Sequence, residues 1–374
     1  MKIAVLGPIT PFRGGIARHT TALARALAAR SDTTLETLSF SRLYPRRLYP
    51  GESDRDPEAQ PPQDLAPRFV LDTLSPLSWQ RTTRALLQAQ PEVAVLPAWT
   101  FFVAPALGTV ARRLARRGVR IVTVAHNAGD HESARWKSAA LRYQLGASHQ
   151  IITHNAPLAR ALEALAPGVP VSISPHPLYD DYPTPCGLLP RRAPLELLMF
   201  GLVRPYKGLD VLLSALARVP AGRVHLSVVG EFWTDLRQTE ARLAALGIAD
   251  RVEIVARYVS DAEAAEYFAR ADAAVLPYLS ASGSGVAALA HWYGRPVVAS
   301  DVAGLAEAVE PAKTGWLFPA GDAEALARLI TEELSPAAHQ AMAPHLARLR
   351  ERLSWAGFAE HLLKAAEAAP APPS

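Results

Sequence analysis

Short apolar runs alternate with longer amphipathic segments along almost the whole chain, and this alternation constrains the fold most strongly. A strand buried on both faces reads as a continuous apolar run, and helices between such strands cover both faces of a parallel sheet. We therefore predict an α/β fold with strands over 3–6, 34–39, 93–97, 121–125 and 151–153, then over 195–200, 224–229, 252–255, 273–276 and 296–299. The predicted helices include 16–30, 79–90, 104–117 and 137–145, followed by 208–219, 234–246, 261–269 and 286–293.

Each half of the chain repeats the same doubly wound plan, and 374 residues are too many for one hydrophobic core. Between the halves, the segment 175–194 holds six prolines in twenty residues. Proline has no amide donor and fixes its own φ, so such a run connects domains rather than packing inside one. We predict two Rossmann-like domains joined by this hinge.

Composition narrows the classes of function. Hydrophobic residues make up 49% of the chain and charged residues 20%, as in an ordinary globular protein. The single cysteine, Cys186, excludes an internal disulfide framework and favours a reducing compartment. No apolar run reaches a membrane-spanning length, and the apolar start at 3–6 is too short for a secretion signal, so we expect a cytoplasmic protein. The net charge of +4 favours anionic ligands or lipid surfaces, and no recognition helix or stacking platform suggests nucleic-acid binding.

Two of the loops that follow predicted strands are built from small residues. In open parallel sheets, ligands bind beyond the carboxyl ends of the strands, where helix N-termini present unpaired amides. Gly14 and Gly15 follow the first strand, where a plain turn is an equally good interpretation, and the dinucleotide pattern G-x-G-x-x-G is absent. After the strand at 273–276, a small-residue loop can offer amides and hydroxyls to a phosphate or a sugar: Ser282, Gly283, Ser284 and Gly285.

The segment F-G-L-V-R-P-Y-K-G-L-D follows the first strand of the second half. Gly201 ends the strand, Arg204 and Lys207 supply positive charge, and Gly208 is expected to begin a helix. Two cations beside a helix N-terminus favour the binding of a diphosphate, although a solvated basic loop is the alternative.

Six motifs in this order resemble glycosyltransferase family 4, which has the GT-B architecture of two facing Rossmann-like domains. They are G-G-I-A-R-H, A-H-N, R-P-Y-K-G, V-G-E, Y-V-S-D and G-R-P-V-V-A-S-D. The likeness covers almost the whole chain and is strongest over 198–322. It implies a retaining hexosyl transfer from a nucleotide diphosphate sugar, without a bound metal or other cofactor.

The resemblance also assigns roles to the domains. The first domain, 1–182 with a returning C-terminal helix at 355–369, would bind an acceptor whose identity the sequence leaves open. The second domain, 190–350, would bind the donor, for which we expect a UDP-sugar, with a GDP-sugar as the second choice. The product would be a polysaccharide, a glycolipid or another glycoconjugate.

Individual residues follow from the same resemblance. Arg204 and Lys207 would stabilise the charge that develops on the leaving diphosphate, and His126 would face the transferred sugar. The other residues implied to contact the donor are Gly14, Gly15, Asn127, Gly201, Glu231, Arg257, Tyr258, Val259, Ser282, Gly283, Ser284, Gly285 and Glu307.

The chain departs from the family pattern at several of these positions. Ser282 and Leu289 stand where the family usually has two glutamates seven residues apart, and Leu202 stands at its usual arginine position. These changes leave two alternatives to transfer open. One is a non-catalytic protein that binds a nucleotide sugar or a partner, and the other is a sugar-nucleotide epimerase, which would need acid–base carboxylates.

The sequence also contains possible metal ligands and two basic stretches. His126, Asp130, His131 and Glu132 could be read as metal ligands, but the set lacks the organisation of a zinc site, and we expect no metal. The D-x-D spacing at 54–56 does not follow a hydrophobic strand and is discounted. His19 suits helix packing and ligand contact equally well. Basic stretches at 42–47 and 112–120 suggest peripheral contact with an anionic membrane.

Overall fold

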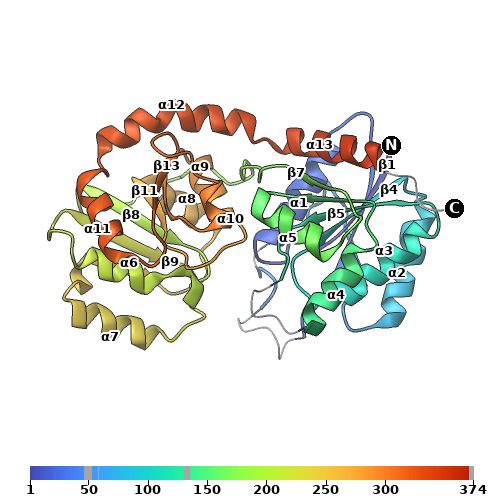
Figure 1. The fold of residues 1–374 in the computed structure, drawn as a ribbon, viewed down its shortest axis with the longest axis horizontal. Helices are drawn as coiled ribbons and strands as arrows, with labels where there is room; N and C mark the ends of the chain where they lie inside the picture. Colours follow the sequence, from blue (N-terminus) through green and yellow to red (C-terminus); the bar gives the residue numbers. More distant parts are fainter. Residues whose placement is uncertain (46–52, 58, 130–134, 370–374) are drawn as a thin grey trace. The chain divides into compact units, whose positions relative to one another are not determined.

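The computed structural model describes residues 1–45, 53–57, 59–129 and 135–369. It divides into two compact units, the first comprising Met1–Pro175 with Trp355–Ser374 and the second His176–Ser354. Each unit contains one parallel sheet packed against helices, as Figure 1 shows. The predicted α/β class with two doubly wound sheets is therefore confirmed.

The sheet of the first unit has seven strands in the order β3-β2-β1-β4-β5-β6-β7, and every described pairing is parallel. The chain starts in the middle of this sheet, builds toward β3, and then crosses to build from β4 toward β7. The inner strands are apolar and buried because helices cover both of their faces. The strands are β1 (Lys2–Leu6), β2 (Thr34–Arg42), β3 (Arg68–Asp72), β4 (Val93–Ala98), β5 (Arg120–Ala125), β6 (Gln150–Thr153) and β7 (Val171–Ile173).

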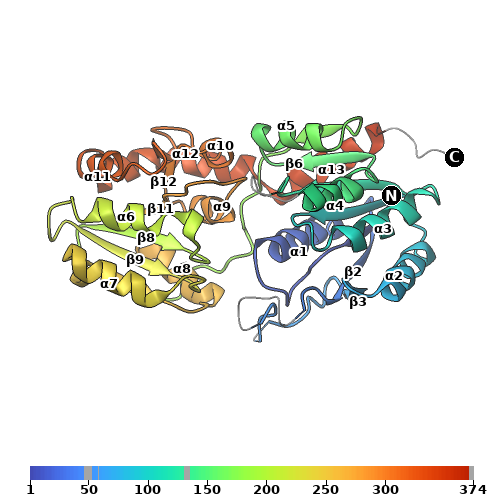
Figure 2. The same cartoon turned by 60° about the horizontal axis from the view of Figure 1, so that its bottom comes forward.

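The helices of the first unit form two groups. In one, the C-terminal helix α13 packs along α1 and against β5 and β6, so the chain returns to its first unit as expected. In the other, α2, α3 and α4 lie side by side (Figure 2). The helices are α1 (Gly15–Ala28), α2 (Pro76–Gln88), α3 (Ala104–Ala115), α4 (Arg135–Leu145), α5 (Ala156–Leu165) and α13 (Trp355–Ala368).

The sheet of the second unit has six parallel strands in the order β10-β9-β8-β11-β12-β13. Its first strand, β8, lies between β9 and β11, and the direction of winding reverses at the β8–β11 pair. Loops on the two sides of such a pair diverge, which makes this the place where doubly wound sheets bind ligands. The strands are β8 (Leu195–Phe200), β9 (Val224–Val229), β10 (Val252–Val255), β11 (Ala273–Leu276), β12 (Val297–Ser300) and β13 (Gly315–Phe318).

Local sequence signals set the ends of several helices in the second unit. Ser260 and Glu263 form a capping box at the start of α8, and Asp322 caps α11 through its side chain. Among the described residues, no helix has both the length and the apolarity needed to cross a membrane. The helices are α6 (Leu209–Leu216), α7 (Leu236–Leu246), α8 (Asp261–Arg270), α9 (Gly285–Trp292), α10 (Ala303–Ala306), α11 (Ala323–Glu332) and α12 (Pro336–Arg352), with short 3-10 turns at η1 (Pro205–Lys207) and η2 (Ala249–Arg251).

Two details of the predicted elements were wrong. The edge strands β3, β7 and β13 were missed, although all ten predicted strands are present. The helix expected to begin at Gly208 begins at Leu209, because Gly208 has a left-handed φ of 67° and caps both η1 and α6. The predicted basic stretch 42–47 and the ligands Asp130, His131 and Glu132 lie partly or wholly outside the described residues.

Candidate functional site

The loop after β8 places two basic side chains at the carboxyl edge of the second unit's sheet. The chain leaves Phe200, turns at Gly201, and forms the short helix η1, which carries Arg204 at its N-cap and Lys207 at its end. Gly208 then redirects the chain into α6. This loop therefore brings Arg204 and Lys207 together near the end of β8, as predicted.

Lys207 is buried, with only 6% of its surface exposed. Its Nζ lies 3.4 Å from the carbonyl oxygen of Phe200 and 5.4 Å from the ring centroid of Tyr278. Burial, together with the nearby Arg204 guanidinium, lowers the pKa of Lys207 to about 7. An ammonium group has three N–H donors, and Phe200 supplies the one described acceptor, at a long distance. The side chain is therefore suited to receive an anion.

Arg204 is held by the loop that follows β9. Its guanidinium lies over the ring of Trp233, 4.0 Å from the centroid, and its buried Nε has no hydrogen-bond acceptor among the described residues. The backbone of Val203 pairs with that loop, because its N–H donates to Glu231 and its carbonyl accepts from Trp233. The Glu231 carboxylate accepts from the indole Nε1 of Trp233 at 3.3 Å. Glu231 thus orients the aromatic platform on which the Arg204 guanidinium rests.

The loop after β11 packs directly on this basic loop, and the loop after β12 packs in turn on the loop after β11. The N–H of Leu279 donates to the carbonyl of Tyr206 at 2.7 Å, and a Cβ on Gly208 would come within 2.0 Å of the Pro277 carbonyl oxygen. A Cβ on Gly304, in α10, would come within 2.3 Å of the Ala281 carbonyl oxygen. Only residues without a side chain allow these approaches, so the loops after β8, β11 and β12 form one continuous surface.

Ser284 and Glu307 occupy helix ends on that surface. Ser284 caps α9, where its hydroxyl accepts from the N–H of Ala287 at 3.4 Å. Glu307 is exposed at the C-cap of the short helix α10, which Gly304 holds against the small-residue loop 281–282.

The segment Arg257–Val259, predicted to contact the donor, follows β10. Arg257 forms a close ion pair with Glu263, with 2.6 Å between Nη2 and Oε1, and this pairing lowers the pKa of the Glu263 carboxyl to about 2. Tyr258 is exposed and Val259 is buried. The Arg257 guanidinium therefore supports the capping box of α8.

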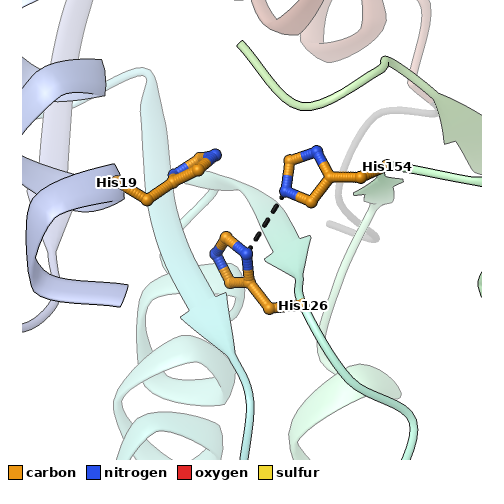
Figure 3. A group of neighbouring side chains, drawn as sticks. All are labelled: His19, His126 and His154. Atoms are coloured by element: carbon orange, nitrogen blue, oxygen red, sulfur yellow. Dashed lines mark hydrogen bonds between the residues drawn. The ribbon is translucent and has the colours of Figure 1, made fainter. Parts of the chain in front are cut away.

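In the first unit, a cluster of three histidines lies at the carboxyl edge of the sheet (Figure 3). His126 directly follows β5, His154 directly follows β6, and His19 comes from α1. The Nδ1 of His126 lies 3.2 Å from the Nε2 of His154, and one ring nitrogen from each histidine lies within 4.8 Å of the others.

Aromatic rings from α13 cover this cluster. The His19 ring centroid lies 4.8 Å from that of Trp355 and 5.4 Å from that of Phe358, and only 1% of the surface of His19 is exposed. His19 therefore both packs against a helix and contributes an imidazole to the cluster.

Two models of glycosyltransferases match the chain. One, described as Glycosyltransferase Family 4, matches residues 13–178, and the other, described as Glycosyl transferases group 1, matches residues 194–335. Together they cover the motifs on which the resemblance rested and every strand of the two sheets except β1. The chain belongs to glycosyltransferase family 4.

Individual members and structures extend this family assignment. A GDP-mannose:glycolipid 4-beta-D-mannosyltransferase of Xanthomonas campestris pv. campestris is 32% identical over 55% of this chain and 57% of its own length. A D-inositol 3-phosphate glycosyltransferase of Rhodococcus opacus is 31% identical over 58% of this chain and 50% of its own. The chain thus spans only about half of the length of these curated relatives. The crystal structure of Anabaena HepE with UDP-glucose superposes with a TM-score of 0.72 at 16% identity, covering 98% of this chain and 100% of the other, which shows the GT-B fold.

Within this family 4 chain, the structure groups the predicted residues by unit. In the second unit, the close approaches connect the loop of Gly201, Arg204 and Lys207 with the loop that holds the predicted residues 282–285 and with the helix that ends at Glu307. In the first unit, Gly14 caps α1 with φ 98°, Gly15 begins that helix, and the Asn127 side chain accepts from the N–H of Gly129 at 3.1 Å.

His154 was missed by sequence reasoning, although a signal was available. The sequence reads A-H-N at the end of β5 and T-H-N at the end of β6, and these strands are neighbours in the sheet. Two histidines at matching positions of adjacent parallel strands must lie side by side. Trp233, the platform for Arg204, was missed because its position depends on the pairing of Val203 with the loop after β9.

Proposed function

We propose that this chain transfers a hexosyl group from a nucleotide diphosphate sugar to an acceptor hydroxyl, with retention of configuration at the anomeric carbon. The observation that carries this proposal is the buried Lys207 beside Arg204 at the point where the second unit's sheet reverses its winding. Two cations with unused donors at this position fit the diphosphate of such a donor. The second unit would therefore bind the donor, and the first unit the acceptor.

The two cations would act on the leaving group. When the bond between the anomeric carbon and the diphosphate breaks, negative charge grows on the diphosphate oxygens. An ammonium group and a guanidinium that are already in place stabilise this charge without reorganising solvent. The diphosphate would also draw a proton onto Lys207, whose pKa is about 7 in the free chain. No step in this account needs a metal ion.

The donor base and sugar remain open to experiment. The named substrate of the Xanthomonas relative is GDP-mannose, and HepE binds UDP-glucose. We keep UDP-sugars as the first expectation and test GDP-sugars in the same series. The acceptor class that we propose is a glycolipid or another glycoconjugate precursor, as in the name of the Xanthomonas enzyme.

The non-catalytic alternative keeps one observation in its favour. Ser282 replaces a family glutamate, and Leu289, at the other glutamate position, is buried in α9 with 3% of its surface exposed. An epimerase would need acid–base carboxylates, and the two positions lack them. If the chain is a transferase, its transfer activity would depend on Lys207 and Arg204, because the glutamate pair is missing.

A binding series followed by product analysis tests the proposal. A nucleotide at about a hundred times its dissociation constant stabilises a protein by roughly 2.7 kcal/mol, which a thermal melt resolves. We expect one of UDP, GDP and ADP to raise the melting temperature, and the matching sugar nucleotide to be consumed only when an acceptor is present. Conversion without acceptor would support epimerisation, and binding without any turnover would support the non-catalytic alternative.

We also propose that the first unit binds an anionic membrane surface through α2, α3 and α4. These adjacent helices and the turn after α3, covering 76–88, 104–120 and 135–145, contain ten arginines and lysines and no aspartate or glutamate. Leu77 and Trp136 are 68% and 61% exposed on the same helices. Basic side chains with exposed apolar neighbours favour a surface of anionic lipid, where a lipid-linked acceptor would be found.

Flotation with vesicles tests the membrane proposal. The full chain should float with vesicles that contain phosphatidylglycerol and remain in solution with vesicles of phosphatidylcholine alone. Replacing the exposed Arg84, Arg117 and Arg142 with glutamine should abolish most flotation, since each charge contributes about 1 kcal/mol near an anionic surface. The matched control replaces three exposed arginines of the second unit, Arg237, Arg242 and Arg328, with glutamine. Equal loss in both variants would contradict a dedicated surface on the first unit.

A further inference from the structure

The cluster of His19, His126 and His154 has the composition of a transition-metal site. The ligand nitrogens come from three different elements of the first unit and lie within 4.8 Å of one another. The group contains no carboxylate. Imidazole nitrogens are preferred by Zn²⁺, Co²⁺, Ni²⁺ and Cu²⁺, whereas Mg²⁺ and Ca²⁺ require oxygen ligands.

The distance between two of the rings fits such a site. His126 Nδ1 and His154 Nε2 are 3.2 Å apart. Two nitrogens that bind one zinc ion tetrahedrally, each at about 2.0–2.1 Å from the metal, are about 3.3 Å apart. The third histidine, His19, has to move its ring nitrogen by no more than roughly an ångström or two to complete the set.

A backbone carbonyl fixes the tautomer of His154. Its Nδ1 lies 3.1 Å from the carbonyl oxygen of Ser174, and a carbonyl oxygen can only accept a hydrogen bond. The hydrogen of a neutral His154 ring is therefore on Nδ1, and Nε2 presents its lone pair to His126. Metal-binding histidines are commonly oriented in this way by an acceptor on the opposite ring nitrogen.

The surroundings favour retention of a bound ion. His19 is almost fully buried, and the rings of Trp355 and Phe358 lie against it. An apolar shell restricts access of solvent to the metal. Three imidazoles also leave a fourth tetrahedral position for water or a ligand oxygen.

We propose that His19, His126 and His154 bind one Zn²⁺-class dication in the first unit. The ion takes the place of the hydrogen shared between His126 Nδ1 and His154 Nε2, and that hydrogen moves to His126 Nε2, so the ring stays neutral. The consequence for activity rests on the proposed function: a bound ion occupies the imidazole that would otherwise face the sugar. Zinc is then an inhibitor of transfer, and a chelator restores the rate.

Cobalt provides a direct test on the full chain. After removal of metals with a chelator, we expect one Co²⁺ per chain to bind and to give the intense visible absorption of a tetrahedral cobalt centre, which one equivalent of Zn²⁺ should remove. Mg²⁺ should have no effect. His154→Gln and His19→Gln should each weaken binding at least about tenfold. The control His345→Ala, in α12 of the second unit, should bind as the parent chain does.

The outcomes separate this proposal from the transferase proposal. Absence of the cobalt spectrum in a folded sample, or an unchanged spectrum in His154→Gln, would overturn the metal site. The nucleotide-dependent rise in melting temperature reports on the second unit and does not require these histidines. A chain that binds a nucleotide but not cobalt would therefore refute the metal site alone. If His19→Gln fails to fold, His154→Gln still tests the half-buried side of the cluster.

Discussion

The two units have sheets of the same type, yet the carboxyl edges of these sheets carry different chemistry. In the second unit, the loop that carries the buried Lys207 and the Arg204 guanidinium over Trp233 packs through Gly208 on the loop after β11. In the first unit, the same edge carries three imidazoles under an aromatic cover. Basic side chains suit a diphosphate, whereas imidazole nitrogens suit hydroxyl groups or a transition-metal cation. One architecture thus presents two different chemistries through the residues at its strand ends.

The largest effect is expected from Lys207→Ala in the second unit. Because the ammonium group would stabilise the leaving diphosphate, its removal should lower kcat about 10²- to 10³-fold. Far-UV circular dichroism and the melting temperature should show that the chain still folds. The control is Lys313→Ala, whose side chain is 56% exposed in an ion pair with Glu310. A kcat within twofold of the parent chain would remove Lys207 from the chemical step.

A smaller effect is expected from His126→Ala in the first unit. A hydrogen bond to a polar group of the sugar in the transition state contributes about 1–3 kcal/mol, so kcat should fall roughly 10- to 100-fold. The rise in melting temperature with nucleotide should persist, because Lys207 and Arg204 lie in the other unit. If His126→Ala also abolished nucleotide binding, the division of roles between the units would be wrong.

The pH dependence of donor binding follows from Lys207. Its pKa is about 7 in the free chain, and a bound diphosphate favours the charged form, so binding above pH 7 takes up a proton. The affinity for a sugar nucleotide should be constant below pH 7 and fall by up to tenfold per pH unit above it. Titration calorimetry between pH 6 and 9 measures this slope. In Lys207→Ala the affinity should be weaker and nearly independent of pH, and an equal slope in both chains would assign the proton to another group.

The central strands could be predicted from the sequence, whereas three of the four edge strands, β3, β7 and β13, were missed. β4 and β8 are covered on both faces and read as unbroken apolar runs. β7 has three residues, and its Ile173 is 43% exposed, while β3 begins at Arg68 and ends at Asp72. Strands with one free edge lose the continuous apolar pattern, and their pairing is determined by the sheet beside them.

In the candidate sites, too, some features could be predicted from the sequence and others could not. The placement of Lys207 and His126 at the carboxyl edges could be predicted, because Lys207 lies in the loop after β8 and His126 directly follows β5. Strand ends of parallel sheets are where ligand-binding residues are expected. The partnership of His126 with His154 requires the knowledge that β5 and β6 are adjacent. The packing of Gly304 against Ala281 likewise joins two loops that no local pattern connects. Contacts between loops depend on strand order, which the sequence pattern does not contain.

The smallest effect is expected from alanine substitutions at two glycines of the second unit. Comparing them separates the cost of backbone strain from the cost of breaking a contact between loops. Gly208 and Gly222 both have left-handed φ values, 67° and 75°, but a Cβ at Gly222 would meet nothing within 4 Å. Alanine at either position costs about 1–2 kcal/mol of unfolding free energy through the backbone conformation alone. Gly208→Ala should cost more than Gly222→Ala, because its Cβ collides with the Pro277 carbonyl 2.0 Å away. It should also weaken nucleotide binding, since the loops after β8 and β11 must separate. Urea unfolding measures the difference, and equal losses in the two variants would mean that these loops do not depend on close contact at Gly208.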